Sequence, residues 1–146
     1  MTNLIYDVKI VNTFFVFFTF TSYVKLQDAF VSETGNAYGS WNIIGYTAPG
    51  QTTKGTNAAA TGSTNNFSYA QAGSYDESKE TATLSATGVG VWVATSKGAL
   101  NDCKMSSTWT IKISQPAGST AAKYEGAYSD ATNCKALTPQ FANIGK

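Results

Sequence analysis

Two groups of side chains have residue types that carry chemistry in enzymes. Ser22 and Lys25 form the Ser-x-x-Lys pattern of serine acyl-enzymes, but no Lys-Thr-Gly or Ser-Asp-Asn partner follows it. Asp76, Glu77 and Glu80 offer the paired carboxylates that glycoside hydrolysis uses. A lysine lies among these carboxylates, which favours a solvated turn over a catalytic pair.

A third group has the oxygen atoms that hard cations prefer. Asp102, Asp130 and Asn133 flank the two cysteines and are candidate Ca²⁺ ligands, but they lack the regular spacing of a cation-binding loop. We therefore predict no catalytic, metal-binding or cofactor-binding residues, no cofactor and no enzymatic activity.

The composition excludes further classes of function. The 146 residues include ten Lys and nine acidic residues but no His and no Arg. Without His there is no Ser-His-Asp triad and no His-ligated zinc or haem. A net charge of +1 gives no electrostatic attraction for nucleic acid. Charged residues make up only 13%, about half the usual ~25%, which is typical of secreted and surface-exposed β-rich proteins and predicts an extracytoplasmic location.

Cys103 and Cys134 are the only cysteines, and both lie in polar, turn-rich surroundings. In an exported protein such a pair predicts one disulfide that closes a loop near the C-terminus. Two buried free thiols are the alternative.

Residues 1–21 contain the most apolar part of the chain. The run between Lys9 and Lys25 is free of charge but, at 15 residues, is shorter than the ~20 that a membrane-spanning helix needs. A membrane anchor, an export signal, a buried core element and an altered start remain open for it.

A helix is predicted over residues 23–34, followed by a long loop over residues 35–66. Gly35 provides the stop signal of the helix, and the loop is rich in Thr, Gly, Ala, Asn and Ser. The helix presents one apolar face for packing, formed by Tyr23, Leu26, Phe30 and Val31.

Five short runs with alternating polarity follow in the β-rich region, residues 67–146. The clearest is Thr108–Ser114, in which Trp109, Ile111 and Ile113 point to one side. The others are Phe67–Ala70, Thr81–Ala86, Val89–Ala94 and Ala122–Tyr128. The chain is therefore expected to form an α+β domain over residues 22–146, with an N-terminal helix packed on an antiparallel β-sheet and a disulfide-closed C-terminal loop.

This order of features resembles the type IV pilin and pseudopilin family, in particular a pilin-like subgroup of fibre-degrading bacteria. Four blocks carry the resemblance, which covers about residues 22–146: Ser22–Val31, Gly39–Gly50, Ala99–Cys103 and Asn133–Gly145. The prepilin cleavage motif of the family, Gly-Phe-Thr-Leu-x-Glu, is absent from residues 1–21, so an altered or truncated start is expected there.

The resemblance implies a structural subunit of a type IV pilus or pseudopilus-like filament, acting in assembly, surface adhesion or secretion. Its partners would be other copies of the subunit in a homo-oligomeric filament, the inner membrane through the apolar N-terminal segment, and a polysaccharide surface. The location would be the cell surface or the periplasm.

A secreted carbohydrate-binding or adhesion module is the alternative, because exposed aromatic rings stack on sugars. Trp109 and Trp92 lie in apolar strand patterns and are expected in the core. Trp41 and Tyr46, in the predicted loop, are the candidate surface aromatics.

Overall fold

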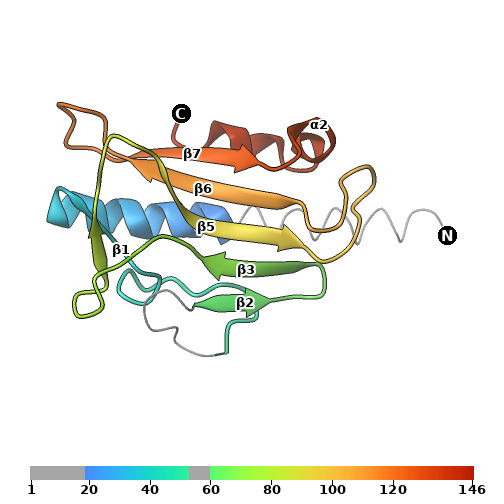
Figure 1. Cartoon of the computed structure of the whole chain (residues 1–146), viewed down its shortest axis with the longest axis horizontal. Coiled ribbons are helices and arrows are strands. Elements are labelled where there is room, and N and C mark those ends of the chain that lie inside the picture. The colour runs from blue at the N-terminus through green and yellow to red at the C-terminus, as the bar shows by residue number, and fades with distance from the viewer. Residues whose placement is uncertain (1–18, 53–59) are drawn as a thin grey trace.

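The computed structural model describes residues 19–52 and 60–146. Within them, a helix over residues 19–34, here called the long helix, lies behind a five-stranded antiparallel sheet (Figure 1). The predicted α+β arrangement of a helix packed on an antiparallel sheet is therefore confirmed. Residues 1–18 of the predicted apolar segment 1–21 lie outside the described part of the chain.

All strand pairs are antiparallel. The large sheet has the order β2-β3-β5-β6-β7, whereas β1 and β4 form a separate two-stranded sheet. The strands are β1 Ala37–Gly39, β2 Thr61–Ser63, β3 Phe67–Gln71, β4 Thr81–Thr83, β5 Val89–Ser96, β6 Thr108–Ser114 and β7 Lys123–Tyr128. Each of the five alternating runs thus contains a strand, but β4 belongs to the two-stranded sheet and not to the large one.

The alternation in β6 defines the inner face of the sheet. Trp109, Ile111 and Ile113 are buried, and in β5 they pair with Ala94, Trp92 and Val89 respectively. The register shifts between Gly90 and Trp92, which is a bulge that lets the neighbours Val91 and Trp92 both be buried. One face of the sheet is therefore built from large apolar side chains.

The long helix is longer than the sequence predicted, because Thr19 is already helical. It ends at residue 34, where Gly35 adopts a φ of 82° and donates its N–H to the carbonyl of Val31 at 2.7 Å. This left-handed conformation is the capping geometry that glycine adopts without steric cost.

The predicted loop, residues 35–66, contains two short strands. β1 pairs with β4 and β2 pairs with β3, so both depend on partners that follow later in the chain. The intervening turn is also partly buried, with Trp41 and Ile44 in the core. Residues 53–59 of this loop lie outside the described part of the chain.

The chain ends in three short helical segments that lie beside β7. They are α2 (Ala131–Cys134), η2 (Lys135–Leu137) and η3 (Pro139–Asn143). The backbone of Phe141 in η3 lies directly against Gly126 of β7, where any side chain would collide with its carbonyl oxygen. Glycine at this position therefore allows the C-terminal segment to lie close to the sheet.

Candidate functional site

The face that the long helix presents to the sheet differs in part from the prediction. Tyr23 and Val31 are buried and Phe30 is partly buried against the core, as expected. Leu26 is not part of this face, since its side chain is 37% exposed. The physical reason is angular: the buried positions recur every three or four residues from Phe20, and Leu26 lies on the flank of this stripe.

Gln27 takes the place expected for Leu26 and is fully buried. Its Nε2 donates to the Tyr23 hydroxyl and to the Gly39 carbonyl, each at 2.9 Å, and its Oε1 accepts from the Gly39 N–H at 2.9 Å. All of its hydrogen-bonding groups are therefore used, which offsets the cost of burying an amide. The four-residue spacing of Tyr23, Gln27 and Val31 is the only signal in the sequence that points to this role.

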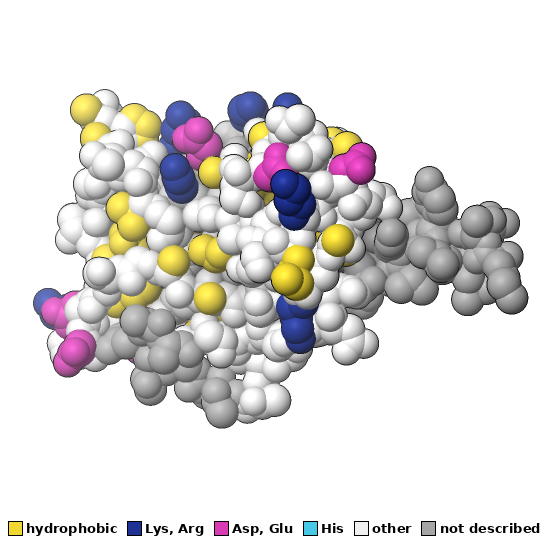
Figure 2. Space-filling model, turned by 45° about the vertical axis from the view of Figure 1, so that its right-hand side comes forward, with side chains coloured by type: hydrophobic (Ala, Val, Ile, Leu, Met, Phe, Trp, Pro, Cys, Tyr) yellow, Lys and Arg dark blue, Asp and Glu magenta, His cyan; other side chains and the backbone are white. Residues whose placement is uncertain are grey.

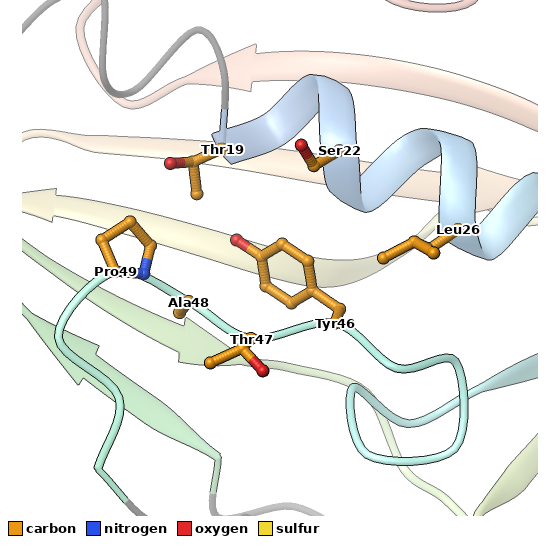
Figure 3. A pocket seen from close by; sticks show the side chains of 7 residues that line it. All are labelled: Thr19, Ser22, Leu26, Tyr46, Thr47, Ala48 and Pro49. Atoms are coloured by element: carbon orange, nitrogen blue, oxygen red, sulfur yellow. The ribbon is translucent and has the colours of Figure 1, made fainter.

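A shallow groove runs along one flank of the long helix. It has a volume of about 280 Å³, and Figure 3 shows three helix side chains, Thr19, Ser22 and Leu26, facing the segment 46–49 across it. Four of its seven lining residues carry a hydroxyl group, and we call it the hydroxyl groove. Its remaining lining residues are Tyr46, Thr47, Ala48 and Pro49.

A second groove lies between the long helix and η3 and has a volume of about 330 Å³. Its lining includes the buried side chains of Phe20 and Ile144 and the partly exposed Val24. We call it the apolar groove. Exposed polar side chains also line it, namely Lys25, Gln140 and Asn143, along with Thr21 and Gly145.

The Ser-x-x-Lys pair is divided between these two grooves. Ser22 lines the hydroxyl groove, whereas Lys25 lines the apolar groove. Both residues are exposed on the helix surface. Neither of these two grooves therefore brings the lysine beside the serine to activate it as a nucleophile.

The two predicted surface aromatics are buried, so that prediction is wrong. Trp41 is fully buried, and its ring packs edge-on against Tyr46 with centroids 4.9 Å apart. The Tyr46 hydroxyl accepts a hydrogen bond from Trp92 Nε1 at 2.9 Å. The segment that carries them turns back over the core. Neither ring is available for stacking on a sugar.

Burial also sets the ionisation of the tyrosines. It raises the pKa of Tyr69 to about 12, and it raises the pKa values of Tyr23 and Tyr46 above their ordinary range. These hydroxyls therefore stay protonated at neutral pH and act as packing and hydrogen-bonding groups.

The carboxylates considered for glycoside hydrolysis hold a turn together. Asp76 Oδ1 accepts from the N–H groups of Ser78 and Lys79, each at 2.9 Å, and from the Ser78 hydroxyl. These bonds lower the pKa of Asp76. Glu80 accepts from Asn42 Nδ2 at 3.0 Å and thereby joins the turn to the segment after β1. Both carboxylates have structural partners.

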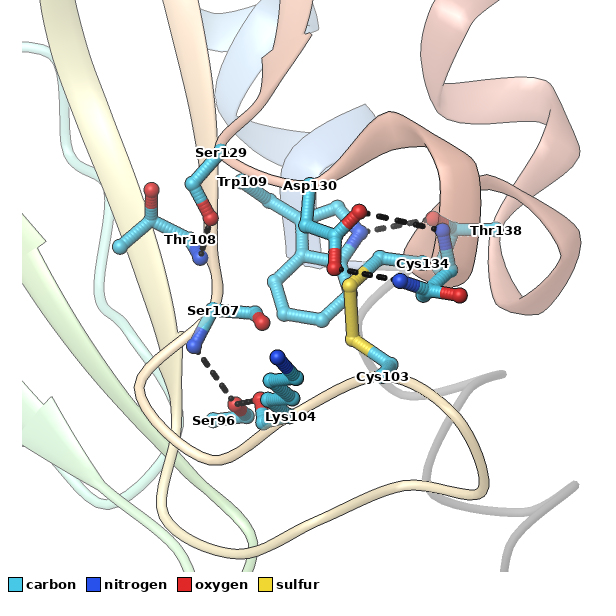
Figure 4. Close-up of a disulfide and its surroundings, with 11 residues drawn as sticks. Ser96, Cys103, Lys104, Ser107, Thr108, Trp109, Ser129, Asp130, Cys134 and Thr138 are labelled. Atoms are coloured by element: carbon cyan, nitrogen blue, oxygen red, sulfur yellow. Dashed lines mark hydrogen bonds between the residues drawn. A yellow bond between two sulfur atoms is a disulfide. The ribbon is translucent and has the colours of Figure 1, made fainter.

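The predicted disulfide is present. Cys103 and Cys134 are bonded and buried, with Cα atoms 4.8 Å apart, and they join the β5–β6 connection to α2 (Figure 4). Loop-closure entropy for a separation of 31 residues corresponds to about 3.5 to 4 kcal/mol of stabilisation. Nearby, Trp109 Nε1 donates to Thr138 Oγ1 at 2.8 Å and fixes the start of η3.

Two of the candidate Ca²⁺ ligands bond to each other. Asp130 caps α2 by accepting from the N–H of Asn133 at 3.2 Å and from its Nδ2 at 2.8 Å, and the Asn133 side chain is the main cause of a lowered pKa of Asp130 (Figure 4). Within residues 19–52 and 60–146, no three His, Cys, Asp or Glu side chains gather closely enough to hold a metal ion.

Surface charge is sparse on the face drawn in Figure 2. Lysines and acidic residues appear there singly or in small mixed groups, separated by uncharged side chains. This face has no large patch of one sign among its described residues. None of the helices in the described part of the chain combines the length and the apolarity needed to cross a bilayer.

Searches of protein-family models, of curated proteins and of solved structures found no match to this chain. Its function is therefore inferred from the geometry described above.

Proposed function

We propose that this chain is a non-enzymatic structural subunit of a type IV pilus or pseudopilus-like filament. In this proposal it carries a pilin-like head over residues 22–146 and needs no cofactor. One observation carries the proposal: the helix that begins within the apolar run is bound along the inner face of the sheet, through Phe20, Tyr23 and Val31.

A helix bound in this way would connect the head firmly to the apolar residues that precede it. The head cannot detach from the helix without exposing Tyr23 and breaking the two hydrogen bonds between Gln27 and the backbone of Gly39. The apolar residues that precede the helix would then bury their surface against neighbouring copies, which is favourable in proportion to the area removed from water. A subunit with one rigid head and one apolar segment is suited to a repeating assembly.

The disulfide supports an extracytoplasmic location, at the cell surface or in the periplasm with anchorage in the inner membrane. Disulfides persist in oxidising compartments and are rare in the cytosol. Cys103 and Cys134 close a segment near the C-terminal end of the head.

Assembly of the full chain tests this proposal. The protein is purified in mild detergent, diluted below the critical micelle concentration, and examined by sedimentation velocity and negative-stain electron microscopy. We expect filaments of uniform width. Val16→Lys, which places a charge in the apolar run, is expected to abolish them, because a buried unpaired charge costs several kcal/mol.

Lys112→Gln, an exposed position on β6, is the matched control and should leave the filaments intact. A full chain that stays monomeric at every concentration, or that forms only amorphous aggregates that Val16→Lys does not change, would contradict the proposal.

A further inference from the structure

The C-terminal segment, residues 131–146, has no backbone pairing with the sheet. Within the described part of the chain, every backbone hydrogen bond of this segment stays inside it or reaches Asp130, the residue before it. The strands of the large sheet, by contrast, are joined to their neighbours by backbone ladders. The C-terminal segment can therefore leave the head without breaking a ladder, as a separate unit of opening does.

A covalent bond and two hydrogen bonds tie this segment to the sheet side of the head. The disulfide joins Cys134 to Cys103 in the β5–β6 connection. Both hydrogen bonds meet at Thr138, whose hydroxyl accepts from Trp109 Nε1 at 2.8 Å and whose carbonyl accepts from the Tyr128 hydroxyl at 2.6 Å. The polar attachment is thus concentrated at one residue.

Phe141 supplies most of the packing of the segment. Its fully buried ring lies edge-on to Phe20 of the long helix, with centroids 5.0 Å apart, and to Tyr128 of β7, with centroids 5.4 Å apart. Its backbone carbonyl lies against Gly126. The ring therefore contacts both the first described turn of the long helix and β7, and opening of the segment would remove it from both.

The disulfide determines how firmly this segment is held. A covalent link at Cys134 keeps Thr138 and Phe141 close to their partners after a transient opening, so that closing is favoured by a high effective concentration. With two thiols in its place, the segment relies on two hydrogen bonds and on the burial of Phe141 and Ile144.

We propose that the C-terminal segment is a redox-sensitive strap. It is closed over β7 and the start of the long helix when Cys103 and Cys134 are bonded, and in the dithiol form it opens as a unit while the sheet stays folded. Closing is an exchange with a disulfide-bearing oxidant. One thiolate attacks the disulfide of the oxidant to form a mixed disulfide, and the other thiolate then displaces the oxidant. Two electrons pass to the oxidant, which leaves as a dithiol with the two protons.

The timing of this switch rests on the proposed extracytoplasmic location, whereas the opening itself does not. Disulfides are rare in the reducing cytosol, so the chain would carry an open strap until it reaches an oxidising compartment. Bond formation there would bring Phe141 against Phe20 and complete the packing around the first described turn of the long helix.

Reduction kinetics of the natural, oxidised chain test the strap without any variant. Both cysteines are buried, so a reductant reaches the sulfur atoms only when the strap opens or the whole chain unfolds. A phosphine reductant is added at urea concentrations below the unfolding transition, and thiols are counted by alkylation and mass spectrometry. A local opening exposes little surface, so we expect a reduction rate that hardly depends on urea. A rate that rises with urea as steeply as global unfolding does would overturn the proposal.

Hydrogen exchange tests the opening of the dithiol form. The Cys103→Ser/Cys134→Ser variant of the full chain, which cannot form the bond, is compared with the oxidised natural chain. We expect exchange in residues 135–146 to accelerate on the order of tenfold or more and to be insensitive to low urea, whereas β5 and β6 exchange through a urea-dependent global opening. Strap and sheet amides that exchange together, with the same urea dependence, would contradict a separate strap.

Lys135→Gln, an exposed position within the strap, is the matched control and should change neither the reduction rate nor the exchange pattern. If the double serine variant does not fold, the reduction kinetics decide the matter alone. Neither measurement uses filaments, so a strap that fails these tests leaves the proposed function standing. Absence of filaments together with a confirmed strap would remove only the proposed function and the timing that rests on it.

Discussion

Two regions of the head, the part under the long helix and the C-terminal segment, are held in place by different interactions. Under the long helix, Tyr23, Gln27, Tyr46 and Trp92 are buried and joined by ring contacts and hydrogen bonds. The C-terminal segment, residues 131–146, packs mainly through one ring, that of the fully buried Phe141, and is also attached by the disulfide and the Trp109–Thr138 bond. Packing and buried hydrogen bonds therefore stabilise one region, whereas in the other a covalent link is added to the packing of Phe141.

The largest expected effect comes from the packed region. Trp92→Ala should lower the free energy of unfolding by about 3 to 5 kcal/mol, because it leaves a cavity and removes the partner of the Tyr46 hydroxyl. Urea unfolding followed by circular dichroism measures the loss. Trp92→Phe, which keeps most of the ring volume, should cost markedly less; equal losses for both variants would show that cavity formation is not the main cause.

Removal of the disulfide should have a comparable but more local effect. The Cys103→Ala/Cys134→Ala double variant is expected to lose up to about 3.5 to 4 kcal/mol. Hydrogen exchange should accelerate most in residues 131–146, because the disulfide joins this segment directly to the β5–β6 connection, while residues 19–34 keep more of their protection. A loss of protection that is uniform along the chain would argue against the contrast between the two ends.

The buried amide in the packed region is expected to matter less than the tryptophan. Gln27→Ala should cost about 1 to 3 kcal/mol, since it leaves the Gly39 N–H and carbonyl without their buried partner. Leu26→Ala is the matched neighbour on the same helix and should cost less, because Leu26 is on the exposed flank. The order of the two losses, measured by denaturant unfolding, would be reversed if Leu26 were the packing residue.

The smallest effect concerns the cap of α2 and depends on pH. Hydrogen bonds from Asn133 lower the pKa of Asp130, so its carboxylate stabilises the folded state above its ordinary pKa of 3.8, and this contribution disappears as the pH falls through the lowered value. The stability difference between the natural chain and Asp130→Ala should therefore shrink in acid. Asp130→Asn keeps the capping oxygen and should show no such pH dependence from this position.

Residue types explain which parts of the fold were predictable. The strands that alternate strictly, above all Thr108–Ser114, followed from the sequence because one face is buried and the other is solvated. β1 and β2 did not, since each has three residues and its pairing is determined by β4 or β3. Local composition contains no information about such distant partners.

In the candidate site, too, some features were predictable from the sequence and others were not. The pairing of Cys103 with Cys134 was predictable because no other cysteine competes. The burial of Gln27 and Trp41 was not predictable, because both depend on contacts with residues that lie elsewhere in the chain. Gly39 binds the Gln27 amide, and the side chain of Gln71 accepts a hydrogen bond from the backbone N–H of Trp41. The two grooves likewise arise from segments that meet only after folding.

Electron cryomicroscopy of the full chain after detergent removal tests the central claim most directly. We expect helical filaments in which the long helices lie inside and the outer face of each sheet points to solvent. Particles that remain single heads, or filaments whose sheets face the axis while the helices lie outside, would contradict it.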